Sequence, residues 1–447
     1  MKNRLITAAV GAALLSVAYV PVASAQSSEL EQLKAQLQAL QAKVEKLEKD
    51  QKATEASADK ALDTVAQTRA GVGEWVGRFQ WKGDFRYRNE DIKQELNPAE
   101  RNRDRMRIRA GFIARMNDTV RTEIQLTTGE SLASGGYGDA RSPNQTLTDA
   151  NSRKRVWFDT AYAEWAPNAN FKVTFGKMRY PWFRPTNVLF FDGDINPEGG
   201  AINWTQGADG LGLFATGFYV QLAERSAQAD STMGGAQFGW RGDIASGTRL
   251  TLAAAYYDHG AVEGYNAVQD ATLPGNAFGN TTTASALICR PGIATCIADD
   301  FNIYELSGEL SMSLAGKPFV FVVNYAKNNE ANFAASATSP SGLDTAYAAG
   351  FQFGRVTTAH TWEVGYLYQK VENDALYGQW VDSDFGAGST GSKGSVFKAG
   401  YGFGRNFRIN GTYFLNDTNI DVPVTASGVT LTNRKYNRWQ LDVNVSF

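Results

Sequence analysis

The sequence predicts an all-β transmembrane barrel of about 16 antiparallel strands, preceded by an α-helical coiled coil. Three observations predict this fold: an export signal at the start, a following segment without glycine, proline or aromatic residues, and a long remainder of alternating apolar and polar residues. All but one of the 44 glycines occur from Gly71 onward, and so do all but one of the aromatic residues. The chain therefore divides into segments 1–25, 26–70 and 71–447.

Residues 1–25 have the pattern of a secretory signal peptide. Lys2 and Arg4 give a positive start, an uncharged apolar run follows, and the small residues Ala23 and Ala25 form a cleavage-like site. A membrane anchor is the alternative, but the apolar run is shorter than the roughly 20 residues that a helical span needs. No later stretch is apolar enough for such a span, so a membrane-spanning mature chain must use strands.

The segment 26–70 predicts a periplasmic helix with a narrow apolar stripe. Apolar residues recur there at intervals of three and four, the a/d pattern of a heptad repeat. They are Leu30, Leu33, Leu37, Leu40, Val44 and Leu47. With Leu30 at position a, flanking g and e positions hold opposite charges, as in Glu29 and Lys34, which favours parallel self-association. A single helix packed on its own domain is the alternative, but such helices usually show a wider apolar face. We expect a homo-oligomer, and the leucine-rich stripe leaves dimer and trimer open.

From residue 71 onward, period-two alternation indicates strands with one apolar and one polar face. Every second residue from Trp439 to Phe447 is apolar, and the residues between them are polar or charged. A soluble sandwich would bury the apolar face, but here that face is rich in the aromatic residues of outer-membrane girdles and the other face carries many charges. The final Phe447 resembles the terminal signature of outer-membrane barrels. Expected partners are therefore the barrel-assembly machinery, outer-membrane lipid and lipopolysaccharide.

Turn-forming residues divide this segment into sixteen strands, because seven short connections alternate with eight longer ones. The short connections are Asn117–Asp118, Pro167–Asn170, Gly207–Gly210, Asp243–Gly247, Ala315–Pro318, Gly354–Ala359 and Gly404–Asn406. The longer ones lie around residues 91–101, 130–153, 180–199, 226–231, 258–301, 328–342, 371–391 and 416–432. An even count with short periplasmic turns is the rule for outer-membrane barrels, and sixteen strands leave room for an aqueous channel.

Several short motifs resemble the proteobacterial "putative porin" family, whose members also carry a coiled coil before the barrel. They are RDRMRIR at 103–109, TGES at 128–131, NQTL at 144–147, GKM at 176–178 and FDGDINPEGG at 191–200. The resemblance implies a porin in the outer membrane of a Gram-negative bacterium, with its coiled coil in the periplasm. It further implies passive diffusion of small hydrophilic solutes and ions, and the likeness to general porins favours a trimer.

Charged residues of the first two strands predict a basic wall inside the barrel. Arginines occupy alternate positions of the second strand and so share one face, where exposure to lipid would cost each roughly 2–4 kcal/mol near the midplane. They are Arg103, Arg105, Arg107 and Arg109. The same parity places Lys82, Arg86 and Arg88 of the first strand inside. The alternative is that these cations only pair locally with Asp84, Glu90, Asp104 and Glu123 around a wide pore.

The third long connection predicts a constriction of this pore. It is partly apolar, as an inward-folded loop would be, and it carries Asp192, Asp194 and Glu198. General porins resemble this arrangement, in which loop acids oppose an arginine cluster and create a transverse field; a weak anion preference is one possible result. Asp192, Asp194 and Asn196 also match the first oxygen positions of a calcium loop, but a proline follows where glycine is needed, so we predict no metal site.

The composition excludes other function classes. The 44 Lys and Arg residues are balanced by 46 Asp and Glu residues, which argues against a nucleic-acid partner. The two histidines, His259 and His360, have no recognisable catalytic partner set, so we predict no enzyme, no cofactor and two ordinary surface histidines. Cys289 and Cys296 share the longest loop of an exported chain, which predicts a disulfide. The alternative function is structural, with the coiled coil spacing or tethering the outer membrane relative to the cell wall.

Overall fold

The computed structural model describes residues 26–447 with a few internal gaps. The gaps are residues 72–75, 98, 132–136, 149, 267–276, 334–341, 423 and 427–428. The signal segment predicted at 1–25 lies outside the described residues. The chain divides into two units, residues 1–77 and residues 78–447.

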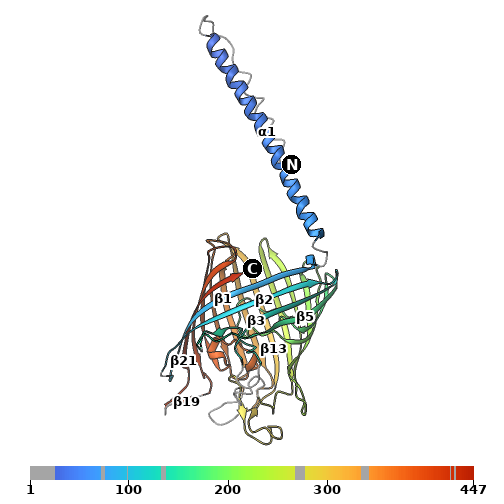
Figure 1. Ribbon diagram of the computed structural model, residues 1–447. Helices are drawn as coiled ribbons and strands as arrows, with labels where there is room; N and C mark the ends of the chain where they lie inside the picture. Colours follow the sequence, from blue (N-terminus) through green and yellow to red (C-terminus); the bar gives the residue numbers. More distant parts are fainter. Residues whose placement is uncertain are drawn as a thin grey trace. The chain divides into compact units, whose positions relative to one another are not determined.

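The described part of the first unit is dominated by one long helix, α1 (Gln26–Gly71, 46 residues; Figure 1). Its interior lacks glycine and proline and is rich in Ala, Leu, Gln, Glu and Lys, which have high helix propensity. Where side chains are described, the apolar stripe faces solvent: Leu37 is 55% exposed and Leu47 is 66% exposed. The coiled coil therefore remains a prediction. Within the described residues, no helix is both long and apolar enough to span a membrane.

The described residues of the second unit form a closed antiparallel barrel of sixteen long strands, which confirms the predicted count. The strands are β1 (Phe79–Gln94), β2 (Arg101–Arg115), β3 (Val120–Thr128), β5 (Val156–Asn168), β6 (Phe171–Lys177), β7 (Glu198–Thr205), β8 (Gly212–Ala223), β9 (Ser231–Ala245), β10 (Thr248–Gly260), β13 (Phe301–Leu314), β14 (Lys317–Asn328), β15 (Thr345–Gly354), β16 (Trp362–Val371), β17 (Ser392–Gly402), β18 (Phe407–Thr418) and β21 (Arg434–Ser446). Each pairs with its neighbours in the chain, and β21 also pairs with β1, where Leu441 lies opposite Asn89. This last pairing closes the barrel.

Short elements occupy the connections and one turn. They are η1 (Val76–Arg78) before the barrel, β4 (Gln145–Thr146), which pairs with β2, the ribbon β11 (Thr282–Thr283) and β12 (Cys296–Ile297), η2 (Gly378–Trp380), η3 (Phe385–Gly388), and the ribbon β19 (Val424–Ala426) and β20 (Val429–Leu431). All seven predicted short turns separate consecutive strands at one end of the barrel, and the eight longer connections lie at the other end (Figure 1).

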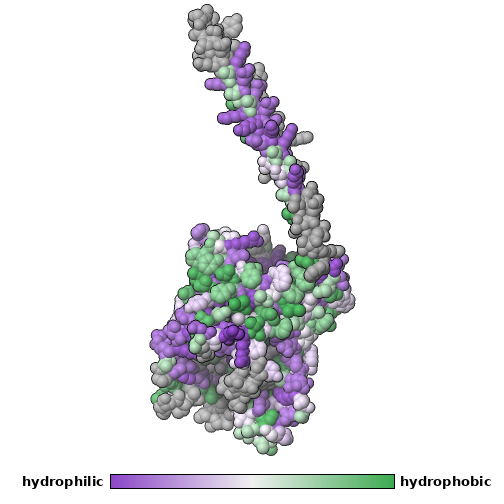
Figure 2. Space-filling view, in the orientation of Figure 1, coloured by the Kyte–Doolittle hydropathy of each residue, from purple (hydrophilic) through white to green (hydrophobic). Residues whose placement is uncertain are grey.

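The apolar face of the strands points outward. Large hydrophobic side chains along the wall are exposed, among them Trp81 (71%), Phe158, Tyr219, Phe238 and Tyr304. Figure 2 shows hydrophobic residues gathered over the wall on the face in view, with hydrophilic residues more frequent toward the long connections. An apolar band with aromatic residues is the lipid-facing surface of outer-membrane barrels, and so the predicted orientation of the strands is confirmed.

The hydrophobic core lies on the inner side of the wall. The third long connection (residues 178–197, the third loop) contributes Phe190 and Phe191, and the seventh (residues 372–391, the seventh loop) contributes Leu376 and Trp380. These side chains pack against inward-facing apolar residues of strands β8 to β18. Trp182 of the third loop stacks against Trp380, with ring centroids 6.4 Å apart. Two loops that pack on each other thus fill part of the lumen.

Candidate pore-lining site

The predicted basic wall is built from cross-strand neighbours of β1 and β2. Arg86 lies opposite Arg107, and Arg88 lies opposite Arg105. Like charges directly opposite one another destabilise a sheet, so the spacing of these arginines requires acidic or neutral partners from the same face.

Asp84 and Glu90 on β1 supply part of that compensation. The Asp84 Oδ1 atom accepts from Arg107 Nη2 at 2.6 Å, and its Oδ2 atom accepts from Arg109 Nε at 2.7 Å. Glu90 is fully buried and contacts the guanidinium of Arg103. Lys82 also forms a local pair, with Glu123 Oε1 of β3 at 2.5 Å. Several cations of the wall therefore form ion pairs with acids on nearby strands, as the alternative interpretation of this wall expects.

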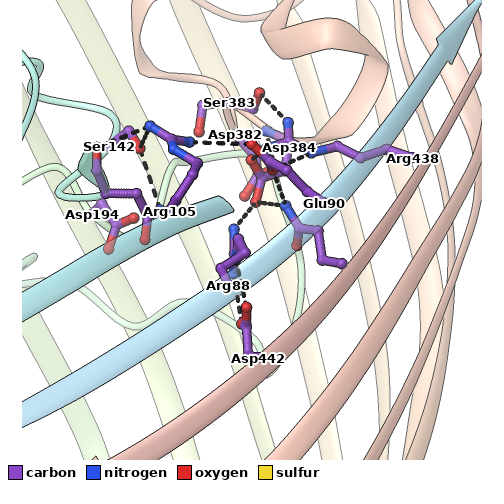
Figure 3. A network of polar contacts seen from close by, with 12 residues as sticks. Arg88, Glu90, Arg105, Ser142, Asp194, Asp382, Ser383, Asp384, Arg438 and Asp442 are labelled. Carbon is purple, nitrogen blue, oxygen red and sulfur yellow. Dashed lines mark hydrogen bonds and ion pairs between the residues drawn. The ribbon is translucent and has the colours of Figure 1, made fainter. Parts of the chain in front are cut away.

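Arg88 joins the wall to the seventh loop. Its Nε atom donates to Asp442 Oδ1 of β21 at 2.6 Å, and its Nη1 atom lies 3.2 Å from Asp384 Oδ2 of the loop. Asp384 also pairs with Arg438 Nη2 of β21 at 2.8 Å, and Arg438 in turn contacts Glu90 (Figure 3). Burial alone would raise the pKa of the Asp384 carboxyl, but Arg438 and Arg88 hold this pKa well below its usual range.

The second long connection (residues 129–155) supplies further partners, both neutral and acidic. Arg86 Nη2 donates to the side-chain oxygen of Asn144 at 2.6 Å, and Arg105 Nη2 donates to the backbone oxygen of the same residue at 2.9 Å. Glu130 accepts from the backbone N–H of Thr146 at 3.0 Å. The TGES and NQTL motifs therefore hold this connection against the arginine wall.

Two glutamine side chains hold the third loop by its backbone. Gln237 of β9 accepts from the N–H of Phe183 at 2.7 Å and donates to the carbonyl of the same residue at 2.9 Å. Gln369 of β16 makes the same pair of bonds with Leu189, at 3.1 and 3.3 Å. Each amide thus satisfies both polar groups of a loop residue that would otherwise be buried unpaired.

Further inward-facing side chains extend this attachment around the wall. The N–H of Thr186 donates to Glu309 Oε2 of β13 at 2.8 Å, and Asn187 Nδ2 donates to Gln352 Oε1 of β15 at 2.8 Å. Near the end of the third loop, Asn196 Nδ2 donates to Asp159 Oδ1 of β5 at 2.7 Å. The third loop therefore contacts the inner face of strands on both sides of the barrel.

The three acids predicted for this loop have different surroundings. Asp192 is only 3% exposed, and its Oδ2 atom accepts from the N–H of Ser383 in the seventh loop at 2.7 Å. Burial, reinforced by Asp382 and Asp194, raises the pKa of Asp192 well above its usual value. The negative charge of Asp194 lies close enough to interact favourably with the guanidinium groups of Arg86 and Arg107.

Glu198 lies apart from these contacts. It stands at the start of β7, where it is exposed and pairs with Lys177 Nζ at 2.8 Å. Asp192 thus serves the contact between the two loops, Asp194 acts toward the wall, and Glu198 pairs locally.

Sequence reasoning predicted the seventh long connection, around residues 371–391, but missed that this loop and Arg438 belong to the site. The available signals were the DSDFG run at 382–386, rich in turn-forming residues, and the alternation of β21, which places Arg438 and Asp442 on the inner face. The partner of Arg88 could not follow from these signals, because 296 positions separate that residue from Asp384.

The predicted disulfide is present between Cys289 and Cys296 in the fifth long connection, where Cys296 begins β12. The prediction of a surface position for His259 is wrong. This side chain is 3% exposed because it lies on the inner face of β10 and packs against Phe301 and Tyr377. Among the described residues, no group of three or more His, Cys, Asp or Glu side chains is arranged to hold a metal ion.

Comparison with solved structures finds matches of similar fold at low sequence identity. OprB of Pseudomonas putida at high pH has a TM-score of 0.52 at 9% identity, covering 84% of this chain and 96% of that chain. OmpF of Salmonella typhi in complex with daunomycin has a TM-score of 0.46 at 11% identity, covering 83% and 97%. OmpT of Vibrio cholerae, with loop L8 deleted, has a TM-score of 0.44 at 11% identity, covering 83% and 100%.

No curated protein matches the sequence. The family model described as "Putative porin" matches residues 93–295 and 289–447, which together make up most of the chain and nearly all of the barrel. The chain therefore belongs to the putative porin family.

Proposed function

We propose that this protein is an outer-membrane porin through which small hydrophilic solutes and ions diffuse passively. The observation that carries the proposal is the charged inner face of β1, β2 and β21 in a barrel whose outer face is apolar. Charged side chains on the inner face of such a barrel set the selectivity of a water-filled path. Family and fold both point to the outer membrane of a Gram-negative bacterium.

The third and seventh loops narrow this path from one side. Their apolar side chains pack into a common core, and the opposite side of the lumen is the arginine wall. Asp384 and Asp194 belong to the loops, whereas Arg88 and Arg107 belong to the wall, so charges of opposite sign meet where the loops approach the wall. We infer a transverse field at this constriction, which orients polar solutes and disfavours apolar ones.

Replacement of Arg105, Arg107 and Arg109 by Ala tests the constriction in planar bilayers. Conductance is expected to rise because bulk is removed, and anion-to-cation permeability is expected to fall because positive charge is removed. The effect on ion selectivity should shrink in molar salt, where the Debye length is about 3 Å. Arg249→Ala is the control, because that guanidinium pairs with Asp243 at 2.8 Å in an exposed turn. Reversal potentials identical to wild type at low salt would remove these arginines from the conducting path.

A structural role is the second candidate, favoured by α1. Its 46 residues span about 69 Å at 1.5 Å per residue, enough to reach well away from a membrane. Deletion of residues 26–70 separates the two roles: conductance should persist, whereas the spacing between outer membrane and cell wall, seen by electron cryotomography, should change only if α1 acts as a spacer or tether.

A further inference from the structure

A cavity of about 370 Å³ opens at the short-turn end of the barrel, beside the basic wall. Residues of β1, β2, β18 and β21 and of two short turns line it. Its lining residues are Asp84, Arg107, Arg109, Val356, Gly404, Arg405, Asn406, Phe407, Arg408, Asn444, Val445 and Ser446. Four guanidinium groups therefore share one cavity with a single lining carboxylate.

That carboxylate, Asp84, already accepts hydrogen bonds from two of the four arginines. Its Oδ1 atom accepts two bonds from Arg107, at 2.6 and 3.0 Å, and its Oδ2 atom accepts from Arg109 at 2.7 Å. Glu363 lies beside the rim, but its Oε2 atom accepts from the backbone N–H of Val356 at 3.1 Å. These two acids consequently have little capacity left for further cations.

Arg405 and Arg408 are exposed, and neither forms an ion pair with any described residue. Arg408 lies opposite Asn444 on β21, and Asn444 lies opposite Arg86 on β1, so this row of the wall contains no acid. The row one step deeper differs, because there Asp442 lies opposite both Arg88 and Asn410. The excess of positive charge is therefore local to the cavity.

A neutral donor lines the same cavity. Asn444 Nδ2 is buried and has no hydrogen-bond partner among the described residues. An amide N–H beside several guanidinium groups is complementary to an acceptor that carries negative charge, because charge-assisted hydrogen bonds are the stronger class and arginine forms paired bonds with planar oxyanions.

We propose that this cavity is an oxyanion-binding subsite, at which carboxylate or phosphate groups of small solutes bind while they cross the barrel. The inference rests on the proposed porin function, since the cavity is placed at one end of the conducting path. Arg405 and Arg408 contact the oxyanion directly, and Arg107 and Arg109 hold the inner side of the subsite together with Asp84. The volume suits solutes of the size of a small dicarboxylate or a phosphate ester and does not suit a polymer.

The test uses succinate and inorganic phosphate as probes, with sucrose as the neutral control. Chloride current is recorded through single channels at about 0.1 M salt, where surface charges are not fully screened. Both oxyanions should reduce this current, and sucrose should not at equal concentration. In Arg405→Gln/Arg408→Gln the concentration for half reduction should rise about tenfold, as expected when charge-assisted bonds are lost.

The matched control is Arg121→Gln/Arg249→Gln, which removes two arginines from the same end of the barrel but from outside the cavity. Each of these pairs with an acid, Glu164 and Asp243, with nitrogen–oxygen distances of 2.8 Å in both cases. A shift of less than twofold in this control supports the subsite. An equal shift in both variants would mean that only the general field matters, and would overturn the proposal.

Two further outcomes distinguish the subsite from the channel. Wild-type channels that conduct but respond to neither oxyanion would overturn the subsite and leave the porin function standing. A wild-type protein that does not conduct would overturn the porin function. In that case, titration calorimetry of succinate into the detergent-solubilised protein tests the subsite independently. A heat of binding that is lost in Arg405→Gln/Arg408→Gln supports the subsite, and no heat of binding in the wild-type protein overturns it.

Discussion

Individual wall arginines differ in what holds them. Arg107 and Arg109 share Asp84 on the neighbouring strand, whereas Arg88 depends on Asp442 of β21 and on Asp384 of the seventh loop. A pair within the wall balances charge along the wall itself. A pair that joins wall and loop fixes the seventh loop against the wall, and Asp384 contacts two arginines there, so Asp384 is the residue from which we expect the larger effect on selectivity.

Asp384→Asn should raise anion-to-cation permeability by about twofold, because negative charge facing Arg88 is removed. The free energy of unfolding should fall by about 2 kcal/mol, since Arg88 and Arg438 each lose one charged partner and keep another. Reversal potentials in a salt gradient measure the first effect and denaturant titration the second. The control is Asp417→Asn, which removes an acid paired with Lys435 Nζ at 2.7 Å. Equal reversal potentials in both variants would count against a role of Asp384 in selectivity.

The contact between the two loops should depend on pH through Asp382. Burial, reinforced by Asp384, raises the pKa of Asp382 to about 6 although Lys398 opposes this, and the buried Asp192 faces the same group. A raised carboxyl pKa means that the folded protein binds the proton more tightly than the unfolded chain. Stability is therefore expected to decrease as pH rises from about 4 to about 6, and to stay lower above that window.

Asp382→Asn should reduce this dependence and leave the part that is due to Asp192. The Oδ1 atom of Asp382 accepts from the N–H groups of Asp384 and Phe385, at 3.0 and 2.9 Å, and the amide of Asn retains that acceptor. The variant should gain on the order of 2 kcal/mol at pH 8 and nothing near pH 4. Fluorescence of Trp182 and Trp380, which stack between the loops, can follow unfolding. A stability difference that is the same at both pH values would contradict the assignment.

At the scale of single elements, the third loop is ordered largely by bonds to its backbone. Gln237 and Gln369 each bind both polar groups of one loop residue, so the loop can lie against the wall without unpaired backbone groups. Glutamine side chains and backbone amides do not titrate between pH 5 and 8. This attachment is thus independent of the pH-sensitive contact with the seventh loop.

Gln237→Ala/Gln369→Ala should loosen the third loop. Four hydrogen bonds are lost, at a cost of about 1 kcal/mol each, so the loop should sample positions away from the wall. Single-channel records should show larger current fluctuations, and protease should cleave within residues 178–197 sooner than in wild type. Gln221→Ala is the control, because that side chain bonds to the carbonyl of Ala223 on its own strand. Unchanged fluctuations and cleavage would mean that apolar packing alone holds the loop.

At the scale of the whole molecule, the sequence predicts the wall better than the contents of the lumen. Alternation and turn residues determine the strands because each outward side chain meets lipid and each turn is local. The lumen is assembled from contacts that are distant along the chain. Arg141 and Gly388, for example, lie 247 positions apart and are joined by a hydrogen bond of 2.8 Å. The basic wall could be inferred from parity, whereas the contacts of the seventh loop with that wall could not.

The assembly of several chains is the largest-scale expectation, and it depends on the stripe of α1. Leu37 and Leu47 are more than half exposed in the single chain, which favours burial against other copies. Replacement of stripe residues by Ala keeps helix propensity and removes the contact surface; the variant is Leu37→Ala/Leu40→Ala/Leu47→Ala. Its oligomers should dissociate at lower protein concentration in native mass spectrometry of the detergent-solubilised protein. The control variant, Gln38→Ala/Glu45→Ala/Lys49→Ala, changes positions outside the stripe and should behave as wild type. If the wild-type spectrum shows only monomers, the expectation of a homo-oligomer is wrong. If both variants dissociate equally, the chains associate through the barrel and not through the helix.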